Sequence, residues 1–373
     1  MGEQRRRTPG PSRPAYAAAG VDVTAGEAAV DMLRNRLAEA GTDLLGGLGG
    51  FGAALALPPG YRRPVLVTAT DGVGTKTEIA RALGRFDTIG QDLVAMCADD
   101  VVCHGARPTW FLDYVAVGRL EPGRVAGIVG GIADACRDIG CALVGGETAE
   151  HPGVMEANAF DLAGFCIGLV EGDELLDGST CQAGDVVLGL ASSGLHANGF
   201  SLVRALLARH SLDLLRPYAD VLDEHGLAAE EVPAAERLGD VLLTPTRLYA
   251  GAALAVRDEL AARGLRLGAM QHVTGGGLAA NLPRNLPEQL GVRLAVDSWP
   301  LPGLFRLLAG LGGLDGPELR ATFNCGVGMT LVIEPAAVEP ATALLAGRGV
   351  EAWPIAELRP LAELGRSRYE EAA

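Results

Sequence analysis

The stretch from Val65 to Lys76, VLVTATDGVGTK, constrains the structure and chemistry of this chain more than any other. Its first residues are aliphatic and β-branched, which favours a strand. The strand leads into a turn with Asp71, two glycines, hydroxyl side chains and Lys76. A carboxylate can bind a hard cation, and glycines let the backbone approach a ligand closely. The stretch therefore resembles a site for a metal-bound phosphate, to which Lys76 supplies a positive charge.

Lys76 is the only lysine among the 31 lysine and arginine residues of the chain. Ordinary surface positions accept either cation, so a single lysine inside the Asp/Gly-rich turn suggests that arginine does not fit there. The alternative is that one lysine was retained by chance. We predict that Lys76 supplies a positive charge to a phosphate oxygen.

Further carboxylates lie between Thr88 and Gly105, where apolar residues at helical spacing predict a helix. Asp92 and Asp99 are seven residues apart and share nearly one face, whereas Asp100 is turned by roughly 100° from Asp99. Carboxylates on an apolar helix are costly to bury unless a cation or another partner compensates them. Two interpretations stay open: a solvated face, or magnesium ligation shared with Asp71, for which Asp100 is the preferred ligand.

The first half of the chain alternates strands and helices. Strands are predicted over 110–118, 141–150 and 160–171, and a helix over 122–139 begins with a proline at its first position. This alternation is typical of a mixed α/β layer. The strand over 141–150 ends in a Gly-Gly-Glu-Thr turn, so Glu147 is a further candidate metal ligand.

Three glycine-rich segments are candidates for anion binding. The run GGLGGFG, residues 46–52, is either a mobile lid or a backbone cradle for an anion. The segment SSGLHANGFS, residues 192–201, joins a strand to a helix expected near Asn198 and offers His196, whose alternative role is that of a structural loop histidine. The third segment, from Thr274 to Gly277, places three glycines at the start of a helix.

The length of 373 residues predicts two domains. A polar stretch over 172–185 marks the boundary between them. We therefore expect a disordered basic tail over 1–15, an N-terminal domain over 16–172 that holds the candidate metal and phosphate residues, a C-terminal domain over 173–360 and a second tail over 361–373. In the C-terminal domain, helical spacing predicts a helix over 245–263.

Charge and composition exclude several classes of protein. The formal net charge of −15 argues against a broad nucleic-acid surface, which requires a basic footprint. No apolar run reaches the roughly 18 residues that would suggest a membrane span. The seven cysteines are odd in number and form no CxxC motif, as expected for buried thiols in a reducing compartment. These features predict a cytoplasmic protein.

Ten motifs in order resemble those of the phosphoribosylformylglycinamidine cyclo-ligases, also called aminoimidazole ribonucleotide (AIR) synthetases. The resemblance covers about residues 16 to 358. The motifs lie between residues 16 and 329 and read YAAAGVDVTAG, GGLGGFG, TDGVGTK, DTIGQDLVAMC, LVGGETAE, AGFCIG, HANGFSLVR, TPTRLY, TGGG and FNCGVGM. The resemblance implies a two-domain α/β (mixed α+β) fold with a C-terminal α/β sandwich domain. It also implies a homodimer in which the N-terminal mixed sheets of two subunits pair.

The activity implied by the resemblance is the fifth step of purine synthesis. Formylglycinamidine ribonucleotide (FGAM) and ATP give AIR, ADP and phosphate, through phosphorylation of the formyl oxygen and attack by a ring nitrogen. Catalytic roles fall on Lys76, Asp71 and His196. The expected Mg²⁺ ligands are Asp71, Asp92, Asp100 and Glu147. The expected ATP contacts are Gly47, Gly49, Gly50, Gly52, Thr70, Gly72, Gly74, Thr75 and Lys76. The expected substrate contacts are His196, Asn198, Thr274, Gly275, Gly276 and Gly277.

The chain departs from the family pattern at two positions. Asp99 stands where an asparagine is usual, and Arg34 stands where a lysine is often found. The extra carboxylate leaves open which of Asp92, Asp99 and Asp100 bind the metal. Two alternative functions also stay open: another ATP-dependent small-molecule kinase of the same superfamily, and a non-catalytic nucleotide-binding dimer.

Overall fold

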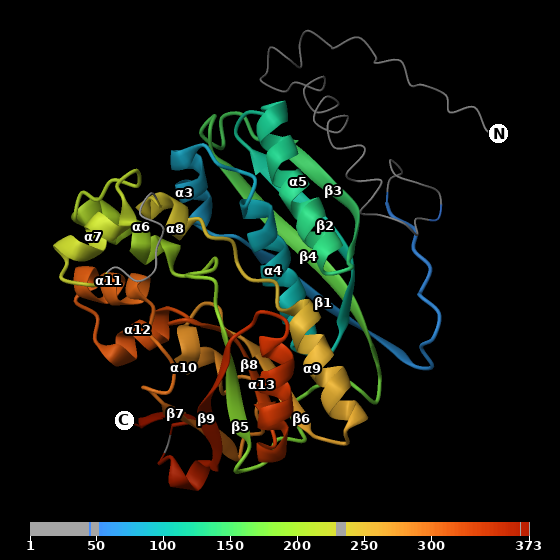
Figure 1. Ribbon diagram of the computed structural model, residues 1–373. Helices are drawn as coiled ribbons and strands as arrows, with labels where there is room; N and C mark the ends of the chain where they lie inside the picture. The colour runs from blue at the N-terminus through green and yellow to red at the C-terminus, as the bar shows by residue number, and fades with distance from the viewer. Residues whose placement is uncertain (1–44, 46–51, 229–235, 366, 373) are drawn as a thin grey trace.

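The computed structural model describes residues 45, 52–228, 236–365 and 367–372 (Figure 1). The tail over 1–15 and most of the glycine-rich run over 46–52, including Gly47, Gly49 and Gly50, lie outside the described residues. Within the described part of the chain, no helix combines the length and apolar character needed to cross a membrane.

The N-terminal half forms a four-stranded sheet in the order β1-β4-β2-β3. β4 runs antiparallel to both of its neighbours, whereas β2 and β3 are parallel. The sheet is therefore mixed, as predicted, and β1 and β3 lie at its opposite edges. The strands are β1 (Pro64–Gly72), β2 (Arg107–Val117), β3 (Ala142–Glu150) and β4 (Phe160–Glu171).

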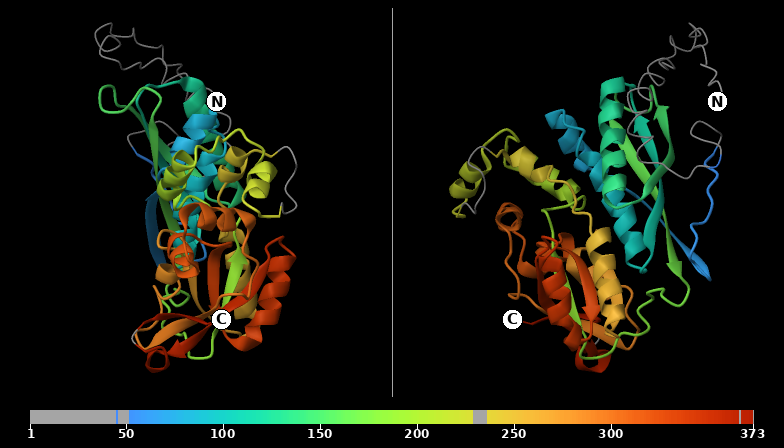
Figure 2. Two further views of the ribbon diagram at one scale, coloured as in Figure 1. Left: turned by 90° about the vertical axis from the view of Figure 1, so that its left-hand side faces the viewer. Right: turned by 45° about the vertical axis from the view of Figure 1, so that its right-hand side comes forward.

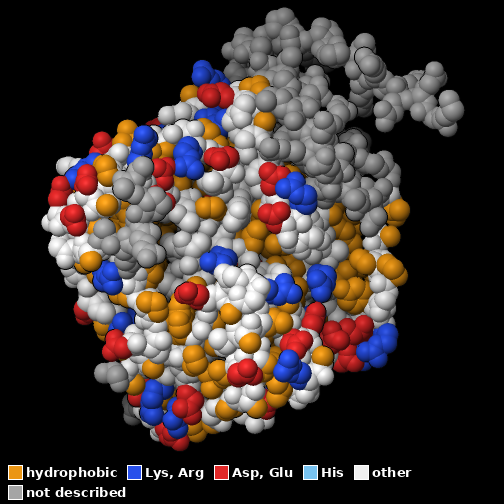
Figure 3. Space-filling view, in the orientation of Figure 1, with side chains coloured by type: hydrophobic (Ala, Val, Ile, Leu, Met, Phe, Trp, Pro, Cys, Tyr) orange, Lys and Arg blue, Asp and Glu red, His pale blue; other side chains and the backbone are white. Residues whose placement is uncertain are grey.

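Helices pack on one face of this sheet. They are α4 (Ile89–Val102) and α5 (Pro122–Asp138), whereas the short helix α3 (Lys76–Leu83) follows the end of β1. α4 contacts β1, β2 and β4, and α5 contacts β3 (Figure 2). Alternate side chains of each strand point to the opposite face, where Leu66 is 57% and Phe165 is 45% exposed. Figure 3 shows hydrophobic side chains gathered along the right-hand edge of the molecule, the side that carries β1 and the segment before it in Figure 1.

The C-terminal half forms a six-stranded sheet in the order β10-β7-β9-β5-β8-β6. Only its β10–β7 pair is parallel. The strands are β5 (Val186–Ala191), β6 (Leu267–His272), β7 (Leu290–Ala295), β8 (Val327–Ile333), β9 (Ala352–Pro360) and β10 (Tyr369–Ala372).

Helices flank the six-stranded sheet. α9 and α13 contact each other and lie side by side in front of it, whereas α6, α7, α8, α11 and α12 gather beside its upper end (Figure 1). These helices are α6 (Phe200–Arg209), α7 (Tyr218–Glu224), α8 (Leu238–Leu242), α9 (Ala250–Ala262), α10 (Gly277–Asn281), α11 (Gly303–Gly312), α12 (Gly316–Thr322) and α13 (Val338–Ala346). Single 3₁₀ turns span Pro335–Ala337 and Leu361–Glu363.

The two halves meet along α4. This helix packs against its own sheet and also contacts α9 and β6 of the C-terminal half. One hydrophobic cluster contains buried residues of both halves, such as Leu93 of α4 and Val273 after β6. A side chain on α4 can therefore contact either half, depending on the face of the helix that carries it.

Two predictions about the C-terminal half are wrong. The helix expected over 245–263 begins only at Ala250, because residues before it donate backbone hydrogen bonds to carboxylates of α4. The segment over 361–373 is not a tail, because its residues 369–372 form β10 beside β7. The backbone N–H of Val292 donates to the carbonyl of Arg368 at 2.8 Å, which extends the sheet by one strand.

Candidate functional site

Asp71 lies at the end of β1, one residue before the strand finishes at Gly72. Its Oδ1 atom accepts a hydrogen bond of 2.7 Å from the N–H of Gly72. Burial raises the pKa of Asp71, the Gly72 hydrogen bond opposes the rise, and the nearby charge of Asp100 adds to it. The carboxylates of Asp71 and Asp100 therefore act on each other, although 29 residues separate them in the sequence.

Asp100 faces a histidine that the sequence analysis missed. The Nδ1 atom of His272, the last residue of β6, lies 2.9 Å from Oδ1 of Asp100. The side chain of His272 is only 2% exposed, and its Nε2 atom is buried without a partner in the structure. Its position at the end of a buried strand, directly before the TGGG motif, was the sequence signal that could have identified it.

Asp99 points into the interior instead. Its two carboxylate oxygens lie 3.1 and 3.3 Å from the backbone nitrogen of Tyr249, at the start of α9. A carboxylate is favourable at this place, because helix N-termini carry unsatisfied N–H groups and a partial positive charge. Burial nevertheless raises the pKa of Asp99 to about 7. Asp99 therefore binds the backbone of the C-terminal half. Asp100 lies on another face of α4, where its charge acts on Asp71.

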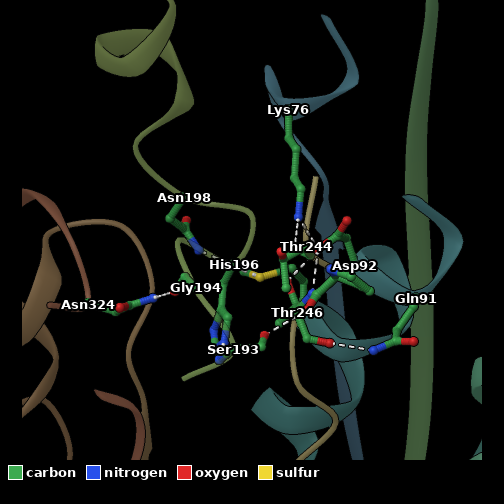
Figure 4. A network of polar contacts seen from close by, with 12 residues as sticks. Lys76, Gln91, Asp92, Ser193, Gly194, His196, Asn198, Thr244, Thr246 and Asn324 are labelled. Carbon is green, nitrogen blue, oxygen red and sulfur yellow. Dashed lines mark hydrogen bonds and ion pairs between the residues drawn. The ribbon is translucent and has the colours of Figure 1, made fainter. Parts of the chain in front are cut away.

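Asp92 and Lys76 form a buried ion pair (Figure 4). The Nζ atom of Lys76 lies 2.8 Å from Oδ1 of Asp92 and 2.7 Å from the carbonyl oxygen of Thr244, and both charged side chains have 0% exposure. The charges of both residues are engaged with each other. The Oδ2 atom of Asp92 is buried without a hydrogen-bond partner. The expected contacts of Asp92 with a metal and of Lys76 with a phosphate stay predictions, and we leave both residues out of the proposed reaction centre.

Glu147 also lies away from Asp71. It belongs to β3, and the strands β4 and β2 separate β3 from β1. Adjacent strands are about 4.8 Å apart, so the two edge strands are roughly 14 Å apart. No group of three histidine, cysteine, aspartate or glutamate side chains in the described part of the chain is placed to hold a metal ion. The four-carboxylate Mg²⁺ site predicted from the sequence is therefore not assembled.

Asp71 and Asp100 by themselves fit a magnesium ion. Mg²⁺ is commonly bound by one or two carboxylates together with phosphate oxygens of a substrate. Burial is the main cause of the raised pKa of Asp71, and the charge of Asp100 adds to it. A divalent cation would favour the charged form of both carboxylates.

A cavity of about 470 Å³ brings together several residues predicted from three separate motifs. One wall is the turn at Gly74 and Thr75, and the start of α6 forms another. The hydroxyl oxygens of Thr75 and Ser201 lie 3.2 Å apart across it. The residues that line the cavity are Gly74, Thr75, Ala197, Asn198, Gly199, Phe200, Ser201, Leu202, Gly275, Gly276, Ala321 and Thr322.

Other predicted contacts lie around or outside this cavity. His196 is buried, and its Nε2 atom accepts a hydrogen bond of 3.2 Å from the N–H of Ser193. Burial lowers the pKa of His196 well below its ordinary value, so the ring is neutral and supports the loop, as in the structural alternative. Thr70 points to the exposed face of β1, and Gly52 is exposed on the segment before it.

The remaining predicted residues border the glycine-rich turns. Gly72 leaves no room for a side chain, because a Cβ atom there would lie 2.9 Å from the carbonyl oxygen of Leu162. Thr274 lies just before the cavity, with its hydroxyl 3.5 Å from the amide oxygen of Asn281. Gly277 is buried at the start of α10. The sequence analysis missed Asn324, which donates to the carbonyl of Gly194 at 2.9 Å.

Comparisons with known proteins agree with this architecture. Residues 52–170 match the model for the AIR synthase related protein, N-terminal domain, and residues 182–364 match the model for the C-terminal domain. The two sheets and their flanking helices thus define the two-domain fold of AIR synthase related proteins. A phosphoribosylformylglycinamidine cyclo-ligase of Burkholderia lata is 46% identical over 93% of this chain and 94% of its own length. The chain belongs to the phosphoribosylformylglycinamidine cyclo-ligase family of enzymes.

Further relatives and solved structures support the same fold. The cyclo-ligase of Burkholderia vietnamiensis is 46% identical over 92% of this chain and 93% of its own length. Thiamine-monophosphate kinase from Stenotrophomonas maltophilia has a TM-score of 0.64 at 20% identity and covers 92% of this chain, with 95% of its own chain matched. The hydrogenase maturation protein HypE in complex with ATP has a TM-score of 0.64 at 20% identity, over 95% of this chain and 94% of that chain.

Proposed function

We propose that the protein converts FGAM and ATP into AIR, ADP and phosphate. The formyl oxygen of FGAM attacks the γ-phosphorus of ATP, and ADP leaves. A nitrogen of the same substrate then attacks the activated carbon, the ring closes, and phosphate departs. The protein's contribution to such a reaction is positioning and neutralisation of phosphate charge. The family membership supports this reaction, because the relatives carry the cyclo-ligase name.

The nucleotide side of the site lies at Asp71 and Asp100. These carboxylates would hold Mg²⁺, and the ion would neutralise charge on the ATP phosphates when bound. The N–H of Gly72 already donates to Asp71, which fixes the carboxylate at the end of β1. The glycine-rich run over 46–52 is proposed to cover the nucleotide.

The substrate side of the site is the cavity between the Gly74–Thr75 turn and the start of α6. It offers hydroxyl groups of Thr75 and Ser201, and Asn198 also lines it. Backbone N–H groups at the first turn of a helix favour an anion such as a ribose phosphate. Gly275 and Gly276 also line the cavity.

One observation carries the proposal. Asp71, which faces Asp100, and Thr75, which lines the cavity, lie four residues apart on one turn. Four residues span at most about 14 Å, so a triphosphate at the carboxylates and an acceptor in the cavity would lie within reach of each other.

The deciding measurement is AIR formation from FGAM and MgATP, together with phosphate release. Equal amounts of AIR and phosphate would support the cyclo-ligase reaction. ADP formation from FGAM and MgATP with neither AIR nor free phosphate would favour another ATP-dependent small-molecule kinase, because a kinase leaves the phosphoryl group on its acceptor. Thiamine-monophosphate kinase, which shares this fold, is an enzyme of that class. If folded protein forms no AIR, no phosphate and no ADP, the result would favour a nucleotide-binding protein without catalytic activity.

The outer face of the N-terminal sheet is the proposed homodimer interface. Leu66 of β1 and Phe165 of β4 expose large apolar side chains there. Contiguous exposed apolar surface on a sheet face is typical of a protein interface. We also place the protein in the cytoplasm, because its seven cysteines are all unpaired.

A further inference from the structure

We infer that Lys76 and Asp92 form an inter-domain clamp, and that Lys76 is a positioning residue for the FGAM site. The ion pair joins α3 and α4 of the N-terminal half to the segment over 244–246 of the C-terminal half. The part of the inference that concerns FGAM rests on the proposed function. The clamp itself rests only on the ion pair and the hydrogen bonds between the two halves.

Asp92 collects three donors on one oxygen. Its Oδ1 atom accepts from Lys76 Nζ at 2.8 Å, from the Thr246 N–H at 2.8 Å and from the Thr246 hydroxyl at 2.6 Å. Lys76 donates in turn to the carbonyl of Thr244. The side-chain amide of Gln91 donates to the carbonyl of Thr246 at 2.8 Å. The short segment over 244–246 is therefore hydrogen-bonded to Lys76 at its first residue and to Gln91 and Asp92 at its last.

A second contact on α4 fixes the end of the same segment. Asp99 lies two turns after Asp92 on the same face and accepts from the N–H of Tyr249. A rotation of the C-terminal half relative to α4 would break both contacts at once. The pair of aspartates therefore sets the relative position of the two halves.

The clamp is connected to both walls of the cavity. Lys76 follows Thr75 directly, and Thr75 forms one wall. The Nζ atom of Lys76 lies 5.6 Å from the ring centroid of Phe200, which lines the other wall at the start of α6. The hydroxyl of Ser193 donates to the carbonyl of Pro245 at 2.6 Å, which ties the clamped segment to the loop that leads into α6.

The burial of the pair explains why the chain keeps one lysine here. A guanidinium group is planar and carries five N–H donors, whereas an ammonium group is a compact charge. Lys76 finds two acceptors, Asp92 and Thr244, and packs near the face of Phe200. An arginine would bring additional donors into a space with 0% exposure. The charge of Lys76 is needed because Asp92 is buried, since removal of one partner leaves an uncompensated charge.

A double-mutant cycle separates positioning from direct phosphate contact. The variants are Lys76→Met, Asp92→Asn and the double variant, and the measurements are the Tm and the steady-state constants for FGAM and MgATP. For Lys76→Met we expect a lower Tm and a rise of about tenfold in the KM for FGAM, with a smaller change in the KM for MgATP. The double variant should recover most of the Tm and bring the FGAM KM to within about threefold of the wild-type value.

Two results would overturn the inference. If Lys76→Met lowers kcat and the double variant recovers the Tm without recovering kcat, then Lys76 takes part in the chemistry. If Lys76→Met leaves the Tm and the FGAM KM unchanged, the pair is no clamp. If wild-type protein makes no AIR, the proposed function fails, and the clamp is decided by the coupling between the two substitutions in Tm.

Two further variants test whether a folding defect or a general change in charge explains the results. Thr246→Val removes one donor to Asp92 and keeps the ion pair, so it should raise the FGAM KM by less than Lys76→Met does. An unchanged Tm and KM in Thr246→Val would contradict the clamp. Arg263→Met is the matched control, because it removes an exposed ion pair with Glu259 of 2.7 Å on α9 and should leave both quantities unchanged.

Discussion

His272 and Asp100 join the two halves of the protein beside the proposed metal site. The Nδ1 atom of His272 on β6 lies 2.9 Å from Oδ1 of Asp100 on α4. Burial opposes the imidazolium form of His272, but the hydrogen bond to Asp100 and the charges of Asp99, Asp100 and Asp71 outweigh it and raise the pKa. These carboxylates thus favour the protonated form of His272.

The first prediction concerns the pH dependence of stability in metal-free protein. The folded-state pKa of His272 lies above its ordinary value of 6.5. The contribution of the His272 charge to the free energy of unfolding is therefore fully present below pH 6.5. It is lost as the pH rises through the raised pKa of the folded state. His272→Gln should lower the free energy of unfolding in urea at pH 6 and change it little at pH 9. An equal loss at both pH values would show that the charge of His272 does not stabilise the fold.

The second prediction concerns Asp113, which faces the helices from the middle strand β2. Burial raises its pKa from 3.8 to about 7. Between these values the folded state holds a proton that the unfolded state has lost, so stability falls as the pH rises, by on the order of 4 kcal/mol when complete. Asp113→Asn removes the charge, and it should be more stable than the wild type at pH 8 and similar at pH 4. Urea unfolding at both pH values measures the difference in stability between the two proteins. A wild type that is more stable than Asp113→Asn at pH 8 would contradict the prediction.

The helix that carries Asp92, Asp99 and Asp100 illustrates what the sequence could predict. The helical spacing placed Asp92 and Asp99 on one face and Asp100 on another, and the structure confirms this division. The partners of each face in the C-terminal half could not be predicted, because they lie 150 to 172 residues later in the chain. Asp92 consequently binds Thr246 and Lys76, and no metal was needed to compensate its charge.

The strands and helices around the site were predicted well where the pattern is local. The strand over 160–171 was predicted with the bounds of β4, and Pro122 begins α5 as expected. The errors occur where contacts between residues distant in the sequence determine the local structure. Residues before Ala250 leave the helix to bind α4, and β10 forms only because β7 offers an edge. His196 offered a polar side chain in a glycine-rich loop, yet its buried position depends on packing beside Tyr249.

The third prediction concerns the proposed dimer. Phe165 is 45% exposed on the outer face of the N-terminal sheet, next to β1. Phe165→Glu places a charge in the proposed interface, where it would be desolvated without a partner, so the protein should become monomeric. Analytical ultracentrifugation measures the change. Leu215→Glu is the matched control, since Leu215 is 55% exposed in the C-terminal half and its replacement should leave the dimer intact. A Phe165→Glu variant that sediments as a dimer would place the interface elsewhere.

The fourth prediction separates the carboxylates that bind the metal from those that do not. Asp71→Asn and Asp100→Asn should each lower kcat/KM for MgATP by about 100-fold, because the phosphate charge then loses its neutralising ion. Glu147→Gln and Asp92→Asn remove carboxylates that lie away from Asp71 and should keep Mn²⁺ binding, measured directly by electron paramagnetic resonance in the presence of ATP. Asp92→Asn is expected to lose stability through the clamp while its Mn²⁺ affinity is preserved. Loss of Mn²⁺ binding in Glu147→Gln, with intact binding in Asp71→Asn, would move the metal from β1 to the opposite edge of the sheet.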